Sequence, residues 1–176
     1  HAAECHRVKK MAASRRNSLL FAALLALGVG TEELRADGDV EITHRIERME
    51  TFVNEDGAKQ TRMVAAKEVV EGDELRYTIT FTNGTSETVA PNSVVLTNPI
   101  PESTEYIEGS AYGSGARVEF SVDGGENFGA PETLRVHGEE GPRPALPSDY
   151  TTIRWYYGPA LLPGQQSHVF FRVRIH

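Results

Sequence analysis

Cysteine is almost absent from this chain. The single cysteine is Cys5, which stands ahead of the first methionine, Met11. A chain without cysteine beyond that point has no disulfide framework, no thiolate metal site and no thiol nucleophile. This composition is compatible with an oxidising compartment, although it does not require one.

Positive charge is also scarce. The 176 residues carry a formal net charge of −7. Residues 1–36 hold six Lys/Arg and three Asp/Glu, so the remainder has 12 basic and 22 acidic side chains and a net charge of −10. Phosphate backbones and anionic lipid surfaces repel such a domain. We therefore expect no nucleic-acid partner and no stable membrane insertion once the leader described next is removed.

No apolar run is long enough to span a bilayer comfortably, which takes about 20 residues. Residues 18–30 read SLLFAALLALGVG and follow Arg15 and Arg16. A charged segment, a short apolar segment and a small residue, here Ala36, are the parts of a secretory signal peptide. We expect a leader helix in residues 1–36 and a secreted protein, placed outside the cell, at the cell surface or in the periplasm. A retained anchor helix is the alternative.

Helical periodicity is missing after residue 37, where apolar side chains recur at every second position. The pattern predicts an antiparallel β-sandwich of about seven to nine strands in one domain. We place an N-terminal strand segment at residues 37–65 and the sandwich at residues 66–176. The expected strands are residues 40–53, 61–70, 75–82, 92–97, 104–107, 117–122, 151–157 and 168–175, with an exposed loop at 138–147. The expected core residues are Tyr77, Ile79, Phe81, Phe120, Trp155, Phe171 and Val173.

Four blocks in a fixed order make this pattern more specific. They read VVEGDELRYTITFTN, SVVLTNPIPESTEYIEGSA, VEFSVDGGENF and YTTIRWYYGPALLPGQQSHVFFRVRI. Across residues 40–176 the chain resembles the bacterial conserved-repeat Ig-like domains called domain of unknown function eleven, in their single-domain secreted form. The resemblance implies an Ig-like sandwich on cell-surface or envelope proteins, and it implies no activity. Asn98 replaces the commoner aspartate, so no metal or charge role is carried over to that position.

Catalytic chemistry has no supporting pattern in this sequence. No two histidines have metal-ligand spacing on one predicted element. The glycine–serine stretches at 109–111 and 113–115 lack the Gly-x-Ser-x-Gly elbow and the following helix that a serine nucleophile needs. We therefore expect a protein that is not an enzyme and that uses no cofactor.

Two loop motifs have two interpretations each. Asp123, Glu126 and Asn127 are oxygen-bearing side chains close together in the sequence, which suits calcium, but the same DGGEN stretch favours a glycine-rich hairpin. We predict no metal site and keep these three residues as a weak calcium candidate. Asn83-Gly84-Thr85 is a glycosylation sequon and also a strong turn, and we favour the turn.

The alternating strand at residues 40–53 suggests a route to assembly. Open sandwich edges accept an added strand. We expect a structural protein that self-associates into an extracellular filament or envelope fibre by β-strand addition. The strand would offer one face made of Val40, Ile42, His44, Ile46 and Phe52.

A basic stripe is the predicted counterpart of that strand. If the last two strands pair, Arg154, Arg172 and Arg174 share their outer face and form a docking stripe. A face of ordinary salt bridges is the other interpretation of these arginines.

A monomeric surface module for adhesion is the alternative function. Its loops at 109–115 and 138–147 would hold a glycan or a protein partner. The tyrosines that could line such a site are Tyr106, Tyr112, Tyr156 and Tyr157.

Overall fold

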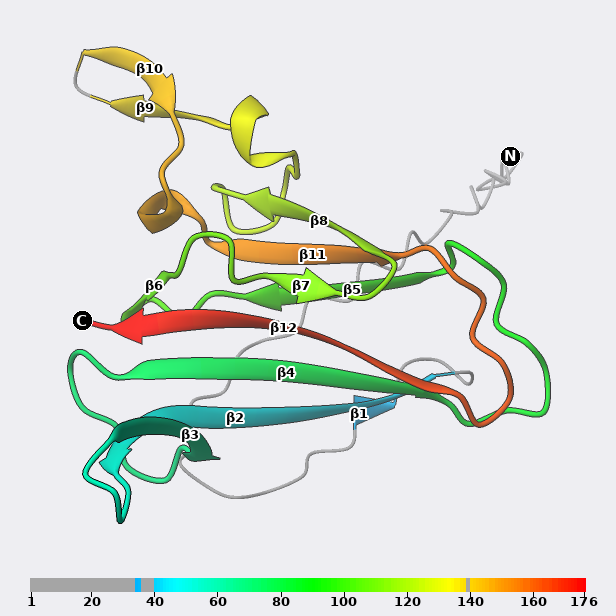
Figure 1. Cartoon of the computed structure of the whole chain (residues 1–176). Helices are drawn as coiled ribbons and strands as arrows, with labels where there is room; N and C mark the ends of the chain where they lie inside the picture. The colour runs from blue at the N-terminus through cyan, green and yellow to red at the C-terminus, as the bar shows by residue number, and fades with distance from the viewer. Residues whose placement is uncertain (1–33, 36–39, 139) are drawn as a thin grey trace, which may run out of the picture.

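The regular secondary structure of the described residues is almost entirely antiparallel β-strand (Figure 1). The computed structural model describes residues 34–35, 40–138 and 140–176. The strands are β1 (Leu34–Arg35), β2 (Val40–Val53), β3 (Lys59–Ala65), β4 (Glu74–Asn83), β5 (Val94–Pro99), β6 (Thr104–Tyr106), β7 (Tyr112–Gly113), β8 (Ala116–Ser121), β9 (Arg135–Gly138), β10 (Gly141–Pro144), β11 (Thr152–Tyr157) and β12 (Gln166–Ile175). Two 3-10 turns, η1 (Pro131–Thr133) and η2 (Pro147–Asp149), interrupt them.

The predicted leader, apart from Leu34 and Arg35, lies outside the described residues, and so does Ala36. Within the described ranges, no helix has the length and apolar character that crossing a membrane requires.

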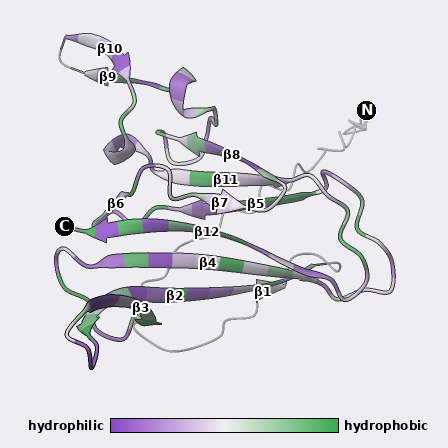
Figure 2. Ribbon diagram, in the orientation of Figure 1, coloured by the Kyte–Doolittle hydropathy of each residue, from purple (hydrophilic) through white to green (hydrophobic). Residues whose placement is uncertain are grey.

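Two sheets form the body of the molecule. The larger sheet has the order β1-β2-β4-β12-β6, with β3 paired to β2 and β7 paired to β12. The smaller sheet has the order β5-β11-β8. Figure 1 shows β2, β4 and β12 as one layer and β5, β11 and β8 as the second. Hydrophobic and hydrophilic segments alternate along β4 and β12 in Figure 2, as expected of strands with one buried face.

The core lies between these two sheets, because the inner faces carry the apolar half of each alternating strand. The ring centroids of Phe81 and Tyr157 are 5.0 Å apart, and those of Trp155 and Phe171 are 5.9 Å apart, so both pairs join the sheets. Burial confirms six of the seven predicted core residues, namely Ile79, Phe81, Phe120, Trp155, Phe171 and Val173. Tyr77 is only half-buried.

Residues 40–65 belong to the larger sheet. β2 pairs with β4 from Val40↔Asn83 to Arg48↔Leu75, and β3 pairs with β2. The predicted division at residue 65 therefore separates two strands of one sheet and does not mark an independent segment. Without β2, the backbone groups along one side of β4 would be left as an open edge, which is why the segment is drawn into the fold.

The prediction of an irregular loop at residues 138–147 is wrong, because part of this segment forms a β-hairpin. β9 and β10 pair from Arg135↔Pro144 to Gly138↔Gly141. Each strand of a two-stranded hairpin has a free edge, so Pro142 and Pro144 can lie in β10 although proline donates no hydrogen bond. Figure 1 shows this hairpin standing away from the two main sheets.

Asn83 closes β4 with a fully bonded amide. Its Nδ2 donates to the carbonyl oxygens of Glu87 at 2.7 Å and Leu161 at 2.8 Å. Its Oδ1 accepts from the backbone nitrogen of Thr85 at 2.9 Å and from Thr85 Oγ1 at 2.8 Å. The side chain is fully buried and all four of its hydrogen-bonding positions are used. The interpretation of Asn83-Gly84-Thr85 as a turn therefore fits the structure. Glycosylation would require the amide nitrogen of Asn83 to be accessible, and this nitrogen is buried.

Candidate functional site

The outer face of the larger sheet, opposite the core, holds a hollow of about 450 Å³. We call it the outer trough. Its lining residues are Met49 of β2, Met63 of β3, Arg76 of β4, Phe170 and Arg172 of β12, and Gly109, Ser110 and Tyr112 at and before β7. The period of two along a strand places Arg76, Phe170 and Arg172 outside, because Tyr77 and Phe171, their neighbours in sequence, point inward. Met49 is likewise on the face of β2 opposite that of the buried Ile42.

Two arginines stand directly opposite each other on the floor of the trough. Arg76 of β4 is the cross-strand partner of Arg172 of β12. Like charges in this position repel each other. Arg172 is compensated by Glu74, since its Nη1 lies 3.4 Å from Glu74 Oε2. Arg76 forms no salt bridge with any side chain that the structure describes.

The Arg76 guanidinium is held by an aromatic ring. Its central carbon lies 4.1 Å from the ring centroid of Phe170. Its Nε is buried and has no hydrogen-bond partner among the described residues. A cation–π contact fixes the position of a guanidinium without neutralising its charge. Arg76 is therefore a positioned cation with hydrogen-bonding capacity to spare.

Tyr112 and Phe170 form the aromatic side of the trough. They are cross-strand partners of β7 and β12, and their ring centroids are 5.5 Å apart. Gly113 makes this approach possible, because a Cβ at that position would lie 2.6 Å from Val169 Cγ1. Tyr112 remains 55% exposed, so its ring is available to a ligand.

Met49 and Met63 form the opposite side. They are cross-strand partners of β2 and β3, and both are half-buried. Methionine side chains are flexible and polarizable, which allows them to adapt to ligands of different shape. This side of the trough therefore favours apolar groups without demanding one particular outline.

Ser110 fixes the edge of the trough next to β12. Its Oγ donates to the carbonyl oxygen of Arg172 at 3.2 Å and accepts from the Arg172 backbone nitrogen at 2.9 Å. The side chain is 5% exposed. The hydroxyl of Ser110 thus acts as a ladder partner for β12 and holds the link between β6 and β7 against the sheet.

The residues predicted for strand addition are engaged within their own sheet. Ile42 is buried opposite Phe81, and Val40 and Phe52 are half-buried. Ile46 is 43% exposed, although it lies on the same side of β2 as the buried Ile42. His44 lies between them on the same side and is exposed to solvent, and partial desolvation of its imidazole lowers its pKa from the ordinary value.

The predicted docking stripe is wrong as a single surface. β11 and β12 lie in different sheets and do not pair. Arg154 is on the outer face of the smaller sheet, where its guanidinium lies 3.5 Å from the Phe128 ring centroid and its Nε donates to Thr97 Oγ1. Arg172 and Arg174 are on the opposite side of the molecule, and both pair with Glu74. The sequence pattern gives each strand's outward face but does not say which strands are neighbours.

The calcium candidate residues form a self-contained loop. Asp123 accepts hydrogen bonds from Ser121 Oγ, from the backbone nitrogens of Glu126 and Asn127, and from Asn127 Nδ2. The bond from the Asn127 backbone contributes most, and together these bonds lower the pKa of Asp123 to about 2. Among the described residues no three His, Cys, Asp or Glu side chains are grouped as a metal site requires. Asp123 therefore has a turn-stabilising role in this structure.

The four predicted tyrosines do not form one site. Tyr112 lines the trough, whereas Tyr106 and Tyr157 are buried in the core. Tyr156 is on the outer face of the smaller sheet, 4.2 Å from the guanidinium carbon of Arg117. Only the 109–115 stretch of the two predicted loops contributes to the trough.

Sequence reasoning missed Met49, Met63, Arg76 and Phe170 as site residues. The period of two that makes Tyr77 and Ile79 core residues places Arg76 on the opposite face of the same strand. Nothing in a single strand indicates that this arginine and a phenylalanine of another strand meet. A comparison of this chain with known protein families, curated proteins and solved structures finds no match.

Proposed function

We propose that this protein is a non-enzymatic binding module that works outside the bacterial cytoplasm, on an Ig-like β-sandwich scaffold. The resemblance of its four sequence blocks supports the Ig-like and extracytoplasmic parts of the proposal. The packing of two antiparallel sheets around Trp155 is compatible with that scaffold. The outer trough supports the binding role.

Arg76 is the observation that carries this proposal. Arg76 is held at 4.1 Å on Phe170, with Arg172 as its cross-strand partner on one side and Glu47 on the other. The Glu47 carboxylate pairs with Arg45 and forms no salt bridge with Arg76 within the described residues, so the Arg76 cation is suited to an anionic group. The protein as a whole is acidic, whereas the residues that line the trough include two arginines and no carboxylate. Charge complementarity of this kind selects the partner and its orientation.

The ligand class that fits best is a protein segment with a carboxylate next to apolar side chains. The carboxylate matches Arg76, and the apolar side chains match Met49, Met63 and Phe170. Methionines are common on surfaces that bind varied peptides. A uronic acid in a glycan carries the same charge, but it gives the two methionines less to contact.

Selection from a displayed library of random heptapeptides tests this function. We expect peptides retained by the wild-type protein to be enriched in Asp or Glu beside Val, Leu, Ile or Phe. Replacing the cation, Arg76→Ala, is expected to weaken the retained peptides at least about tenfold, in line with the loss of a charge-assisted bond.

Arg154→Ala is the matched control, because Arg154 also stacks on a phenylalanine, Phe128, but lies on the outer face of the other sheet. We expect it to leave peptide binding unchanged. An equal loss of peptide affinity in both variants would contradict the proposal of a peptide site. So would a wild-type protein that enriches no acidic peptide but retains acidic oligosaccharides.

Self-association is the second candidate function, as a subunit of an extracellular filament or fibre. Strand addition by β2 would require the nine residue pairs between β2 and β4 to break in one copy and re-form in another. A different observation favours self-association, namely two adjacent exposed valines, Val69 and Val70, between β3 and β4.

A further inference from the structure

The segment between β3 and β4 contains an exposed acidic and apolar turn. We call residues 68–71, with the sequence Glu-Val-Val-Glu, the EVVE turn. Val69 is 36% exposed and Val70 is 66% exposed. Both glutamates are exposed as well. Neighbouring large apolar side chains that both face solvent are typical of a contact surface.

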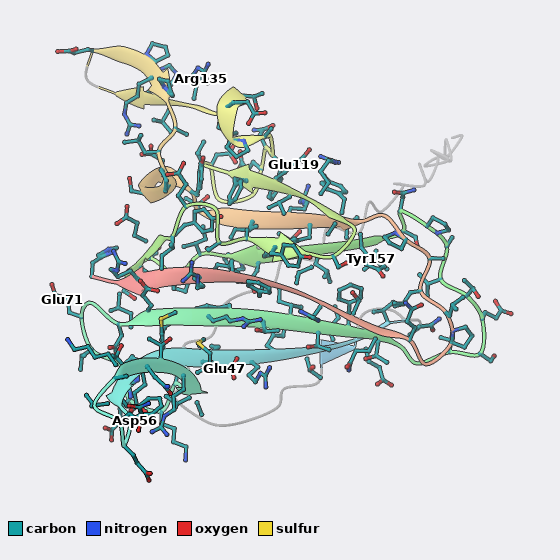
Figure 3. All side chains as sticks on the ribbon, viewed as in Figure 1. Glu47, Asp56, Glu71, Glu119, Arg135 and Tyr157 are labelled. Atoms are coloured by element: carbon teal, nitrogen blue, oxygen red, sulfur yellow. The ribbon has the colours of Figure 1, made fainter. Side chains whose placement is uncertain are left out.

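The second half of the EVVE turn, from Val70 onward, is held in shape by the residues that follow it. The Val70 backbone nitrogen donates to Asp73 Oδ2 at 3.0 Å, and the Asp73 backbone nitrogen donates to the Val70 carbonyl oxygen at 3.1 Å. Gly72 donates to the carbonyl oxygen of Ile175 at 2.8 Å, which ties the turn to the end of β12. Figure 3 shows Glu71 at the periphery of the molecule, on the turn that leads into β4. A preorganised projection loses little conformational entropy when it binds.

We propose that the EVVE turn of one copy of this chain occupies the outer trough of a second copy. This inference rests on the proposed function, because it names the peptide segment that the trough would hold. The turn has the chemistry that the trough lacks, with two carboxylates for Arg76 and two valines for Met49, Met63 and Phe170. None of the residues that line the trough belongs to the turn, so the two surfaces are separate and can be used by different copies.

A contact between two different surfaces can either close or repeat. If each of two copies places its turn in the other's trough, the result is a two-fold dimer. If the rotation does not close, the same contact repeats as a chain of molecules. Either outcome gives self-association without moving β2 out of its own sheet.

Mass measurement by light scattering on the full chain, over a range of concentrations, tests the proposal. We expect the wild-type mass to rise with concentration. Arg76→Ala changes the trough, and the double substitution Val70→Ser with Glu71→Lys changes the turn. Each is expected to lower the association constant at least about tenfold. Arg154→Ala should associate as the wild type does, and melting temperatures should show that all variants are folded.

A mixture of the two association-defective variants gives the sharpest result. The turn variant has an intact trough and the trough variant has an intact turn, so their equimolar mixture should form a one-to-one dimer that neither forms alone. A mixture that stays monomeric overturns the loop-in-trough contact.

The two proposals can fail separately. A wild-type protein that remains monomeric up to about 1 mM overturns the self-association. If acidic heptapeptides then still bind in an Arg76-dependent manner, the trough is a site for a foreign segment. If they do not bind, the proposed function fails as well. Association that persists at wild-type strength in both variants would also overturn the loop-in-trough contact.

Discussion

At the residue scale, short polar side chains decide where this chain turns. Asn83 ends β4 and Asp123 lies just after β8, and each uses its side-chain oxygen to accept backbone hydrogen bonds from the residues after it. That behaviour is readable in the sequence, because Asn and Asp favour such turns wherever they precede glycine. The full burial of Asn83 is not readable, since Leu161, one of its acceptors, is distant in the chain.

Asp123 predicts how the protein responds to acid. Its pKa is lowered to about 2 from an ordinary value of 3.8, because Asn127 and Ser121 donate hydrogen bonds to the ionised form. The stability from these bonds is therefore complete above pH 3.8 and is lost as the pH falls towards 2. We expect Asp123→Asn to lose less stability than the wild type between pH 4 and pH 2. The melting temperature of each protein, measured at several pH values, shows this difference. Melting temperatures that fall equally with pH in the two proteins would contradict the stabilising role of ionised Asp123.

At the element scale, strands that look alike in sequence contribute differently to the fold. β2 and the β9–β10 hairpin both alternate in character and both carry charged side chains. β2 pairs with β4 and β3 along its whole length, whereas β9 and β10 pair only with each other. Their structural importance follows from these partners and not from their own residues.

This difference predicts contrasting results for two deletions. The hairpin ends are already joined, since Ala145 donates to the carbonyl oxygen of Leu134 at 3.1 Å. Replacing residues 135–144 with Asn-Gly should change the free energy of unfolding by less than about 1 kcal/mol, because shortening a surface loop costs little. Deleting residues 40–53 should leave β4 with an open edge and should unfold or aggregate the protein. Urea denaturation compares the two, and a stable monomer after the second deletion would show that β2 is dispensable.

At the scale of the whole molecule, one core joins the two sheets. Trp155 is fully buried at its centre, with Phe171 of the other sheet packed against it. The acidic surface and the cationic trough are also properties of the whole molecule, because Arg76, Phe170 and the two methionines come from four different strands.

The shared core predicts the effect of truncating its largest side chain, Trp155. Trp155→Ala should lower the free energy of unfolding by about 3–5 kcal/mol, through lost apolar burial and the cavity left behind. Both sheets should still unfold in a single transition, since they share that core. Denaturant curves followed by far-UV circular dichroism and by tyrosine fluorescence would check this. An unchanged midpoint, or two separate transitions, would argue against a shared core.

The sequence by itself determined most of the strands, their inward faces and most of the core, because a period of two is a local property of the chain. It also predicted the turns at Asn83 and Asp123, where the deciding hydrogen bonds are mostly between near neighbours. It missed the β9–β10 hairpin and carried the strand at 61–70 past the end of β3 at Ala65. It did not determine which strands are adjacent. That is why the stripe of Arg154, Arg172 and Arg174 fails and why the boundary at residue 65 divides a sheet. Only the tertiary structure set Arg76 on Phe170 between two methionines and a tyrosine, because cross-strand contacts depend on pairing between segments far apart in sequence.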